Sequence, residues 1–349
     1  MNCYISKNYK NKTNAGNKAK TDIEQIMKDM GFKNVGLPQS THHNKVLSFF
    51  ITLIGVLKTP FCLNKGDILV MQYPLKKYFS FVCNMAHLRG AKVVTLIHDL
   101  GSFRRKALTI KQEIKRLNHS DYIIAHNDKM RAWLLNNGIT APLGTLEIFD
   151  YLSKTKATRK ETNPPYNILY AGGLNPRKNT FLYEIGEHIK SYGFNLYGNG
   201  FDATKAKRKE HFKYMGFVKS DDLIATAQGD FGLVWDGFSI SSCTGDFGEY
   251  LQYNNPHKTS LYIRCELPVI IWRKAALADF ILKHNIGFAV DSLEEIEPLL
   301  ANLSKERYEQ MRHNTTIISD KLANGYFART AISTAVSALT NQESLYPRE

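Results

Sequence analysis

Residues 230–272 read DFGLVWDGFSISSCTGDFGEYLQYNNPHKTSLYIRCELPVIIW, and they carry the clearest structural pattern in the chain. The segment begins and ends with short apolar runs, residues 231–235 and 269–272, whose composition is typical of strands buried on both faces. A polar loop and a helical stretch over residues 257–266 lie between these two runs. A strand, a helix and a second buried strand in this order predict a βαβ unit with parallel strands.

The same alternation extends outward in both directions. Ile23, Ile26, Met27 and Met30 follow the i, i+3, i+4, i+7 spacing of one helix face. Strands that alternate with helices along the whole chain predict an α/β fold with two doubly wound, Rossmann-like domains. The other predicted strands are residues 2–6, 67–72, 92–97, 122–126, 167–170 and 195–197, and the later predicted helices are residues 179–191, 220–228, 274–284, 293–303, 305–323 and 326–340.

A polar, basic segment interrupts this alternation near the middle of the chain. Residues 153–166 contain almost no apolar side chains and include two consecutive prolines, which is typical of a linker. The segment separates a first domain, residues 1–152, from a second, residues 167–325, and leaves residues 326–349 as a terminal helix. Ligands of doubly wound folds bind beyond the carboxyl ends of the strands, so we expect a site in the cleft between the domains.

The charge balance indicates the class of ligand. The 349 residues include 46 Lys and Arg against 32 Asp and Glu, a net charge of +14. Such a balance suits a phosphorylated ligand, an anionic membrane surface or nucleic acid. The charges are spread along the chain, and no helix has a basic stripe interleaved with aromatic side chains, so the sequence does not favour nucleic acid.

The cysteines and the longest apolar run indicate the compartment. Five scattered cysteines without a CxxC pair argue against a disulfide framework and a zinc site, and for a reducing environment. Residues 1–12 are too polar for a signal peptide, and residues 47–57 form an apolar run too short to span a bilayer. We therefore expect a cytoplasmic protein. Residues 47–57 are interpreted most simply as a buried helix, and contact with the inner face of the membrane is the other interpretation.

Two groups of cations follow predicted strands of the second domain. Residues 171–178, AGGLNPRK, place Arg177 and Lys178 after a glycine turn and just before a helix. Residues 254–258, NNPHK, place Lys258 in the first turn of another helix, with Pro256 in that turn and an asparagine as its cap. Cations are unfavourable at a helix N-terminus unless an anion lies there, so both groups predict a diphosphate site. The alternative for Arg177 and Lys178 is a solvated pair at a helix start.

Glycines next to aromatic residues, and one His-Asp pair, complete the candidate site. Tyr214 and Gly216, like Tyr197 and Gly198, pair an aromatic ring with a glycine turn, which fits either a nucleobase or a core aromatic at a turn. Gly16 marks a turn between a strand and a helix, where the backbone is able to approach a phosphate. His98 and Asp99 follow a predicted strand and suit acid-base chemistry or hydrogen bonds to sugar hydroxyls, although an Asp cap beside a core His gives the same pattern.

Together the GG-x-x-x-RK turn, the FGLVWDG strand, the G-x-x-GEY-x-x-YNNPHK loop and the LPVIIW strand resemble the small GT-B sugar transferases of bacterial surface glycosylation. That family includes glucosyltransferases that extend N-acetylglucosamine on serine-rich adhesins, and galactofuranosyltransferases of O-antigen assembly. The resemblance implies a nucleotide-sugar domain at residues 167–325, an acceptor-side domain at residues 1–152, and a terminal helix that packs back on the first domain. It also implies a homo-oligomer.

The resemblance implies a UDP-sugar donor bound mainly by the second domain. Arg177 and Lys258 would bind the diphosphate, and Gly16 of the first domain would close over it. Tyr214 and its neighbours would hold the uracil. The complete predicted donor site is Gly16, Asn17, Arg177, Lys178, Tyr214, Gly216, Tyr253, Asn254, Asn255, His257 and Lys258. Asp236 and Asp246 are candidates for contact with the sugar.

One departure from the larger retaining GT-B families concerns the chemistry. Those families have two glutamates at positions that Tyr253 and Leu261 occupy here. We therefore expect inversion, with Asp99 as general base beside His98. No Asp-x-Asp pattern is present to hold a metal, so we expect cations in place of Mg²⁺. The predicted reaction transfers glucose or a related hexose to a GlcNAc-terminated glycan on a surface glycoprotein.

Two alternatives remain open at this point, and a third is not supported. The chain is alternatively a galactofuranosyltransferase acting on a lipid-linked polysaccharide precursor, or a non-catalytic partner of another transferase. A nucleotide-sugar epimerase or dehydrogenase would need a G-x-G-x-x-G turn with a paired acid, which the sequence lacks.

Overall fold

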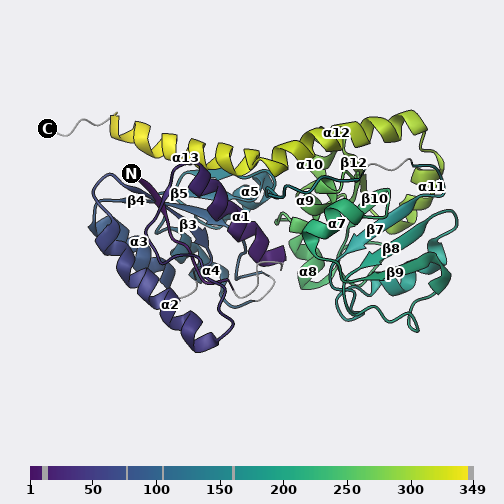
Figure 1. The fold of residues 1–349 in the computed structure, drawn as a ribbon, viewed down its shortest axis with the longest axis horizontal. Helices are drawn as coiled ribbons and strands as arrows, with labels where there is room; N and C mark the ends of the chain where they lie inside the picture. The colour runs from purple at the N-terminus through teal and green to yellow at the C-terminus, as the bar shows by residue number, and fades with distance from the viewer. Residues whose placement is uncertain (10–14, 76–77, 104–105, 159–161, 345–349) are drawn as a thin grey trace. The chain divides into compact units, whose positions relative to one another are not determined.

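The computed structural model describes residues 1–349 except 10–14, 76–77, 104–105, 159–161 and 345–349 (Figure 1). The chain forms two compact units, each of which is described by itself. The first contains Met1–Asp150 and Gly325–Glu349, and the second contains Tyr151–Asn324.

The first unit contains a six-stranded parallel sheet in the order β2-β1-β3-β4-β5-β6. The direction of winding changes between β1 and β3, and ligands of doubly wound sheets bind beyond the strand ends at such a point. The strands are β1 (Asn2–Tyr4), β2 (Lys33–Asn34), β3 (Ile68–Tyr73), β4 (Lys92–Ile97), β5 (Tyr122–Ala125) and β6 (Leu143–Thr145). The helices are α1 (Ala15–Asp29), α2 (Lys45–Lys58), η1 (Thr59–Cys62), α3 (Phe79–Leu88), α4 (Ile110–Leu117), α5 (Asp128–Asn136) and α13 (Tyr326–Ser344).

The second unit contains another six-stranded parallel sheet, in the order β12-β11-β10-β7-β8-β9. Its winding reverses between β7 and β10, as in dinucleotide-binding folds. The strands are β7 (Asn167–Ala171), β8 (Gly193–Tyr197), β9 (Phe212–Gly216), β10 (Phe231–Val234), β11 (Val269–Trp272) and β12 (Gly287–Val290). The helices are α6 (Phe181–Glu184), η3 (Ile185–His188), η4 (Lys209–His211), α7 (Ser220–Thr226), α8 (Gly245–Tyr250), α9 (His257–Arg264), α10 (Ala278–Lys283), η5 (Leu293–Glu295), α11 (Ile296–Ala301) and α12 (Lys305–Ala323).

The strands expected from apolar runs are the central strands of both sheets. Every residue of β3, β5, β10 and β11 is buried, which explains why these strands consist of apolar residues with little alternation. The four strands that the sequence did not predict, β2, β6, β9 and β12, lie at sheet edges. They are short or partly exposed, or they begin with glycine, so their composition resembles that of loops.

The segment expected as a linker is attached to the second unit. Among residues 151–166, those that the structure describes form no helix or strand. The buried guanidinium of Arg264 on α9 donates to the carbonyl oxygens of Ser153 and Thr155, at 3.0 and 2.9 Å, and to the hydroxyl of Ser319 on α12, at 2.7 Å. One arginine therefore joins the irregular segment to two helices of the second unit.

The apolar run at residues 47–57 is a helix, but its interpretation as a buried helix is wrong. It forms most of α2, whose large side chains are exposed along one face. Helix α2 lies on the outside of the first unit (Figure 1). Throughout the described part of the chain, no helix is both long enough and apolar enough to cross a bilayer.

The terminal helix α13 belongs to the first unit, where it packs on α1 and on β4, β5 and β6. Asp150 caps its N-terminus, because the carboxylate accepts the backbone N–H groups of Phe327 at 3.2 Å and Ala328 at 2.6 Å. Asp150 is only 2% exposed. Burial raises the pKa of Asp150 to about 7 despite these hydrogen bonds, and nearby Asp22 adds to the rise while Arg329 opposes it.

This raised pKa predicts a pH-dependent stability. The folded state binds the Asp150 proton more tightly than the unfolded chain does, so its stabilising effect is complete below about pH 4 and is lost as pH rises through about 7. We expect the free energy of unfolding of the parent to fall relative to Asp150→Asn over this range, by up to about 4 kcal/mol. Urea titrations at several pH values measure this difference. Asp128→Asn, at an exposed carboxylate on α5, is the control. Parallel stability curves for the parent and Asp150→Asn would contradict the assignment.

Candidate functional site

Two glycine turns meet at the carboxyl ends of β7 and β8. Gly172 has φ of 150° and Gly198 has φ of 138°. A Cβ on Gly198 would lie 1.8 Å from the carbonyl oxygen of Gly172, so no larger residue fits there. A Cβ on Gly172 or Gly173 would meet nothing within 4 Å. The turns are therefore tightly packed against each other, and open space lies beside Gly172 and Gly173.

A charged cluster lies beside these turns, and its centre is the buried carboxylate of Asp236, which follows β10. Oδ1 of Asp236 accepts the hydroxyl of Tyr170 at 3.1 Å and the ammonium of Lys258 at 3.0 Å. Lys178 lies 3.9 Å from the same oxygen. The Lys258 ammonium also donates to the Tyr170 hydroxyl at 3.2 Å and lies 4.6 Å from the centre of that ring. Burial, followed by the Asp236 charge, raises the pKa of Tyr170, so this hydroxyl keeps its proton.

Two expectations about α9 are wrong. Lys258 does not lie at the helix start without a counter-charge, because Asp236 pairs with it from the neighbouring strand end. The cap is not an asparagine either. Pro256 occupies the N-cap position, in extended geometry and with no side-chain cap hydrogen bond. The proline therefore lies one residue earlier than expected, and the helix begins at His257.

Arg177 differs from the two lysines. Its backbone N–H donates to the side chain of Asn175 at 2.8 Å, which fixes the turn after Pro176. Its side chain is exposed and has no hydrogen-bond or ion-pair partner among the described residues. The cluster of Lys178, Lys258 and Asp236 carries a net charge of +1, and Arg177 adds a further positive charge next to it in the chain.

The loop before α9 provides polar groups. Asn255 is buried, while Tyr253 and Asn254 are partly buried. Oδ1 of Asn254 is inaccessible to solvent and has no hydrogen-bond partner in the part of the chain that the structure describes. His257 stacks on Tyr151, with ring centres 4.8 Å apart and planes at 20°. A buried acceptor without a donor is costly, so Asn254 suits a ligand hydroxyl.

Tyr214 and Gly216 belong to the edge strand β9. Tyr214 is therefore not the core aromatic that the sequence allowed as an alternative. Tyr214 is 48% exposed, and its hydroxyl donates to the carbonyl oxygen of Gly198 at 3.0 Å. Gly216 accepts the backbone N–H of Gly198 at 2.8 Å. The aromatic ring of Tyr214 is thus held beside the second glycine turn and remains accessible to a planar ligand group.

The remaining predicted residues belong to the first unit. His98 and Asp99 follow β4, and both are partly buried. Nε2 of His98 lies 2.5 Å from Oε1 of Gln72 on β3, and the His98 ring stacks on Phe149 at 5.1 Å. Gly16 and Asn17 lie in the first turn of α1. Asp246, a sugar candidate of the second unit, is exposed in the first turn of α8.

Sequence reasoning missed a set of polar groups near the ends of β1 and β3, of which Gln72 contacts His98. Glu24 on α1 is buried and accepts the hydroxyls of Ser6 at 2.5 Å and Tyr9 at 2.6 Å. Burial raises the pKa of Glu24. Lys7, just beyond β1, donates to the carbonyl oxygen of Gln72 at 3.1 Å. The signal that was available is the glutamine near the end of an otherwise apolar strand, since a buried polar side chain must be hydrogen-bonded.

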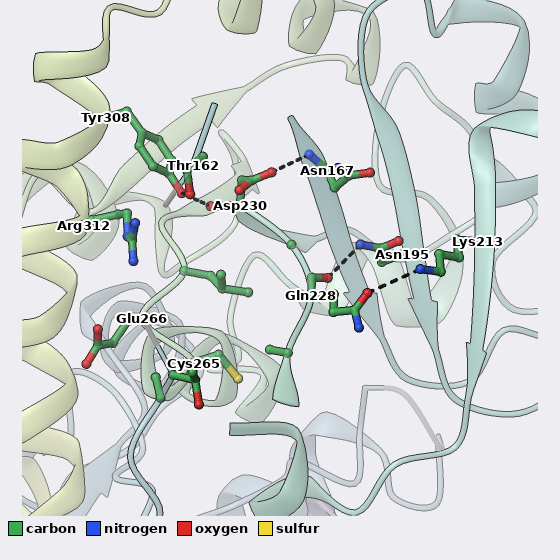
Figure 2. Close-up of a pocket in the computed structure, with 15 residues that line it drawn as sticks. Thr162, Asn167, Asn195, Lys213, Gln228, Asp230, Cys265, Glu266, Tyr308 and Arg312 are labelled. Carbon is green, nitrogen blue, oxygen red and sulfur yellow. Dashed lines mark hydrogen bonds between the residues drawn. The ribbon is translucent and has the colours of Figure 1, made fainter. Parts of the chain in front are cut away.

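A cavity of about 310 Å³ lies at the opposite edge of the second sheet (Figure 2). Asn167, the first residue of β7, and Asp230, just before β10, line it, together with Gln228. Asp230 accepts the Asn167 backbone N–H at 2.7 Å, and Gln228 accepts the amide of Asn195 at 2.8 Å. The cavity lies at the amino ends of the strands, and several of its polar groups are paired with one another, so it is not the candidate site.

Within the described residues, no three His, Cys, Asp or Glu side chains gather in a way that would hold a metal ion. The arrangement at the carboxyl ends of β7, β8 and β10 instead combines lysines, an arginine, glycine turns and an exposed aromatic ring. These groups suit an anionic ligand with a planar part.

This chain is similar to known proteins in both sequence and fold. The protein-family model described as "Glucosyltransferase 3-like, N-terminal domain" matches residues 2–148. The family model described as "Glucosyltransferase 3-like, C-terminal domain" matches residues 168–335. The chain is 34% identical over 330 residues to beta-1,6-galactofuranosyltransferase WbbI of Escherichia coli (strain K12), covering 93% of this chain and 95% of that protein. It is 24% identical to glucosyltransferase 3 of Streptococcus gordonii, over 91% and 93%.

Among solved structures, WaaG, a glycosyltransferase involved in lipopolysaccharide biosynthesis, superposes with a TM-score of 0.56 at 12% identity, covering 96% of this chain and 99% of that one. The two parallel sheets and this likeness define a glycosyltransferase fold of the GT-B class. The chain belongs to the glucosyltransferase 3-like family of glycosyltransferases.

The position of Asp236 leads to a stability prediction. In Asp236→Asn the Tyr170 hydroxyl keeps an acceptor, but the mostly buried Lys258 ammonium loses its counter-charge. We expect the free energy of unfolding to fall by roughly 1–3 kcal/mol. Thermal or urea denaturation measures the change, with Glu249→Gln, at an exposed carboxylate on α8, as the control. Equal stability of Asp236→Asn and the parent would show that Asp236 is not needed to balance Lys258.

Proposed function

We propose that this chain transfers a hexose from a UDP-sugar to a glycan acceptor, with the donor bound by the second unit. The observation that carries the proposal is the group of Arg177, Lys178 and Lys258, with Asp236 paired to both lysines, beside two glycine turns at the carboxyl ends of β7 and β8. A departing UDP develops negative charge on its diphosphate, which fixed cations stabilise. We propose that these cations do so in place of a metal ion.

The other groups are assigned by their chemistry. Arg177 has free donors and suits two oxygens of one phosphate. Lys258, held by Asp236 and Tyr170, contributes a charge at a fixed position. Oδ1 of Asn254 accepts a hydroxyl of the donor, and the exposed Tyr214 ring lies against the uracil. We also retain Tyr253, Asn255, His257 and Gly216 of the second unit, and Gly16 and Asn17 of the first, as donor-binding residues.

We assign the acid-base chemistry to the first unit, the acceptor side of the enzyme. Asp99 is proposed to remove the proton of the acceptor hydroxyl, with inversion at the anomeric carbon. The contact with Gln72 and the stacking on Phe149 support a fixed orientation for His98, the neighbouring proposed residue. A positioned base of this kind is worth about 10²–10⁴ in rate.

The first candidate reaction is transfer of glucose or a related hexose to a GlcNAc-terminated glycan on a surface glycoprotein. The second is transfer of galactofuranose to a lipid-linked polysaccharide precursor, which is favoured by the higher identity to WbbI, 34% against 24% for glucosyltransferase 3. UDP release measured with UDP-glucose, UDP-galactose, UDP-galactofuranose and UDP-GlcNAc in turn distinguishes the two. We further propose a cytoplasmic location and self-association of the chain.

The diphosphate assignment predicts the effect of removing its cations. We expect Arg177→Ala and Lys258→Ala each to lower kcat/KM for the sugar nucleotide by about 100-fold or more. Arg177 is exposed, so its loss leaves the fold intact. Arg208→Ala, at an exposed arginine paired with Glu210, is the matched control. Calorimetry with UDP and a UDP-release assay with EDTA present measure binding and turnover.

If both cation variants fold and turn over the donor at the parental rate, the diphosphate assignment is wrong. If the parent binds no UDP at all, the chain is better explained as a non-catalytic partner of another transferase. Activity that disappears with EDTA and returns with Mg²⁺ would overturn the proposal that cations replace a metal.

The assignment of Asp99 predicts a different kinetic pattern. Asp99→Asn should bind UDP as the parent does and lose turnover by about 10²–10⁴, because only the proton acceptor is removed. Isothermal calorimetry and UDP release give the two quantities, and NMR of the product gives its anomeric configuration. A product that retains the configuration of the donor would rule out the role of Asp99 as the base of an inverting reaction.

A further inference from the structure

Helix α2 packs on the first unit through its small residues. Gly55 and Val56 are buried, as is Thr59 at the start of η1, and Ser48 and Thr52 are partly buried. These positions follow a spacing of three or four residues and so form one helix face. A Cβ on Gly55 would lie 3.4 Å from the backbone nitrogen of Leu37, which shows how closely the helix approaches the neighbouring segment. Small residues therefore form the centre of the face turned toward the protein, and Ile51 and Leu53 are partly buried as well.

Most of the large apolar side chains of α2 are exposed. Val46 is 64% exposed, Phe50 is 50% exposed, and Phe61 in η1 is 86% exposed. A helix of a water-soluble protein usually has the opposite arrangement, with its bulky apolar residues inward. We call this surface the α2 face, and its members are Val46, Leu47, Phe49, Phe50, Ile54, Leu57 and Phe61.

Positive charge is concentrated in the same unit. Residues 1–150 contain 22 Lys and Arg against 10 Asp and Glu, so they account for 12 of the 14 net positive charges. Within residues 30–98 there are eight Lys and Arg, and Asp67 is the only acidic residue. Asp67 is buried and is paired with the N-terminal amine at 2.7 Å. No exposed acidic side chain therefore lies in the part of the sequence that contains the α2 face.

We propose that the α2 face docks this chain on an anionic lipid bilayer, with α2 lying in the plane of the interface. Its 14 residues extend for about 21 Å. Phe50, Ile54 and Phe61 enter the boundary between headgroups and acyl chains, and the lysines around them, such as Lys58 and Lys65, meet the headgroup phosphates. This inference does not depend on the proposed sugar donor.

Charge distinguishes the bilayer from a second copy of the chain. Two copies that met through this face would bring two cationic regions together, because residues 30–98 of each copy carry a surplus of positive charge. Anionic headgroups neutralise this charge. Neither the apolar side chains nor the cations alone select the lipid, but their combination in one stretch of the chain fits an acidic bilayer.

Vesicle sedimentation tests the proposal with the full chain. We expect binding to vesicles of phosphatidylcholine mixed with phosphatidylglycerol, and much weaker binding to phosphatidylcholine alone. Raising the salt from about 0.1 to about 0.5 M should weaken binding, since screening shortens the reach of charges. The double substitution Phe49→Ser with Phe50→Ser should lower the partition coefficient at least about tenfold. Lys58→Glu with Lys65→Glu should reduce binding to the anionic vesicles and leave the weak binding to phosphatidylcholine vesicles unchanged.

The controls use exposed apolar residues of the second unit. Leu282 and Ile317 are 48% and 47% exposed, comparable to Phe49 and Phe50. The pair Leu282→Ser and Ile317→Ser should therefore bind vesicles as the parent does. Thermal denaturation confirms that each variant is folded, and calorimetry with UDP on the same samples keeps a failure of the donor proposal separate from a failure of this one.

Three results would overturn the inference. They are no binding of the parent to anionic vesicles, equal binding to both kinds of vesicle, and unchanged binding after the double phenylalanine substitution. Light scattering identifies the competing occupant. If the parent is a dimer that this substitution dissociates, and it does not bind vesicles, the α2 face is an interface between copies of the chain.

Discussion

A buried carboxylate, Asp236, determines the electrostatics at the carboxyl edge of the second sheet. It accepts the Lys258 ammonium and the Tyr170 hydroxyl on the same oxygen, and Lys178 lies nearby. Without this carboxylate, a mostly buried lysine would oppose folding. With it, the chain keeps two lysines at the strand ends in the folded state, and their combined charge still exceeds that of the carboxylate. These three side chains thus carry a net positive charge before any ligand binds.

The strand order explains how residues far apart in the sequence meet at that carboxylate. Strands β7 and β10 are neighbours, although about 60 residues separate them in the chain. Tyr170 therefore lies beside Asp236, and α9, which follows the loop after β10, brings Lys258 to the same edge. The glycine turns after β7 and β8 are packed so tightly that Gly198 admits no Cβ. The reversal of winding between β7 and β10 brings the cations together. The glycine turns have no side chains to fill the space beside these cations, so a ligand has room there.

Sequence patterns predicted the central strands, because a strand buried on both faces is an uninterrupted apolar run. They did not predict the edge strands, such as β9, which has no fully buried residue and ends in glycine. The electrostatic argument identified Lys258 and Arg177 as residues of interest but not the counter-charge of Lys258. That pairing depends on which strands are adjacent, and local spacing does not contain this information. The polar groups near the ends of β1 and β3 were missed for the same reason, since Glu24, Gln72 and Lys7 come from separate elements.

Helix α2 shows a further limit of pattern analysis. The run at residues 47–57 is apolar nearly all round, and such a run has the same composition whether a protein core or a lipid surface covers it. Periodicity alone therefore favoured burial. The distribution of charge contains the missing information, because residues 30–98 carry one acidic residue, Asp67, which is buried and paired. A core places no constraint on acidic side chains in the surrounding sequence, whereas exposed acidic side chains would weaken the proposed contact with an anionic bilayer. Long-range charge composition, read together with the apolar run, distinguishes the two environments when local spacing does not.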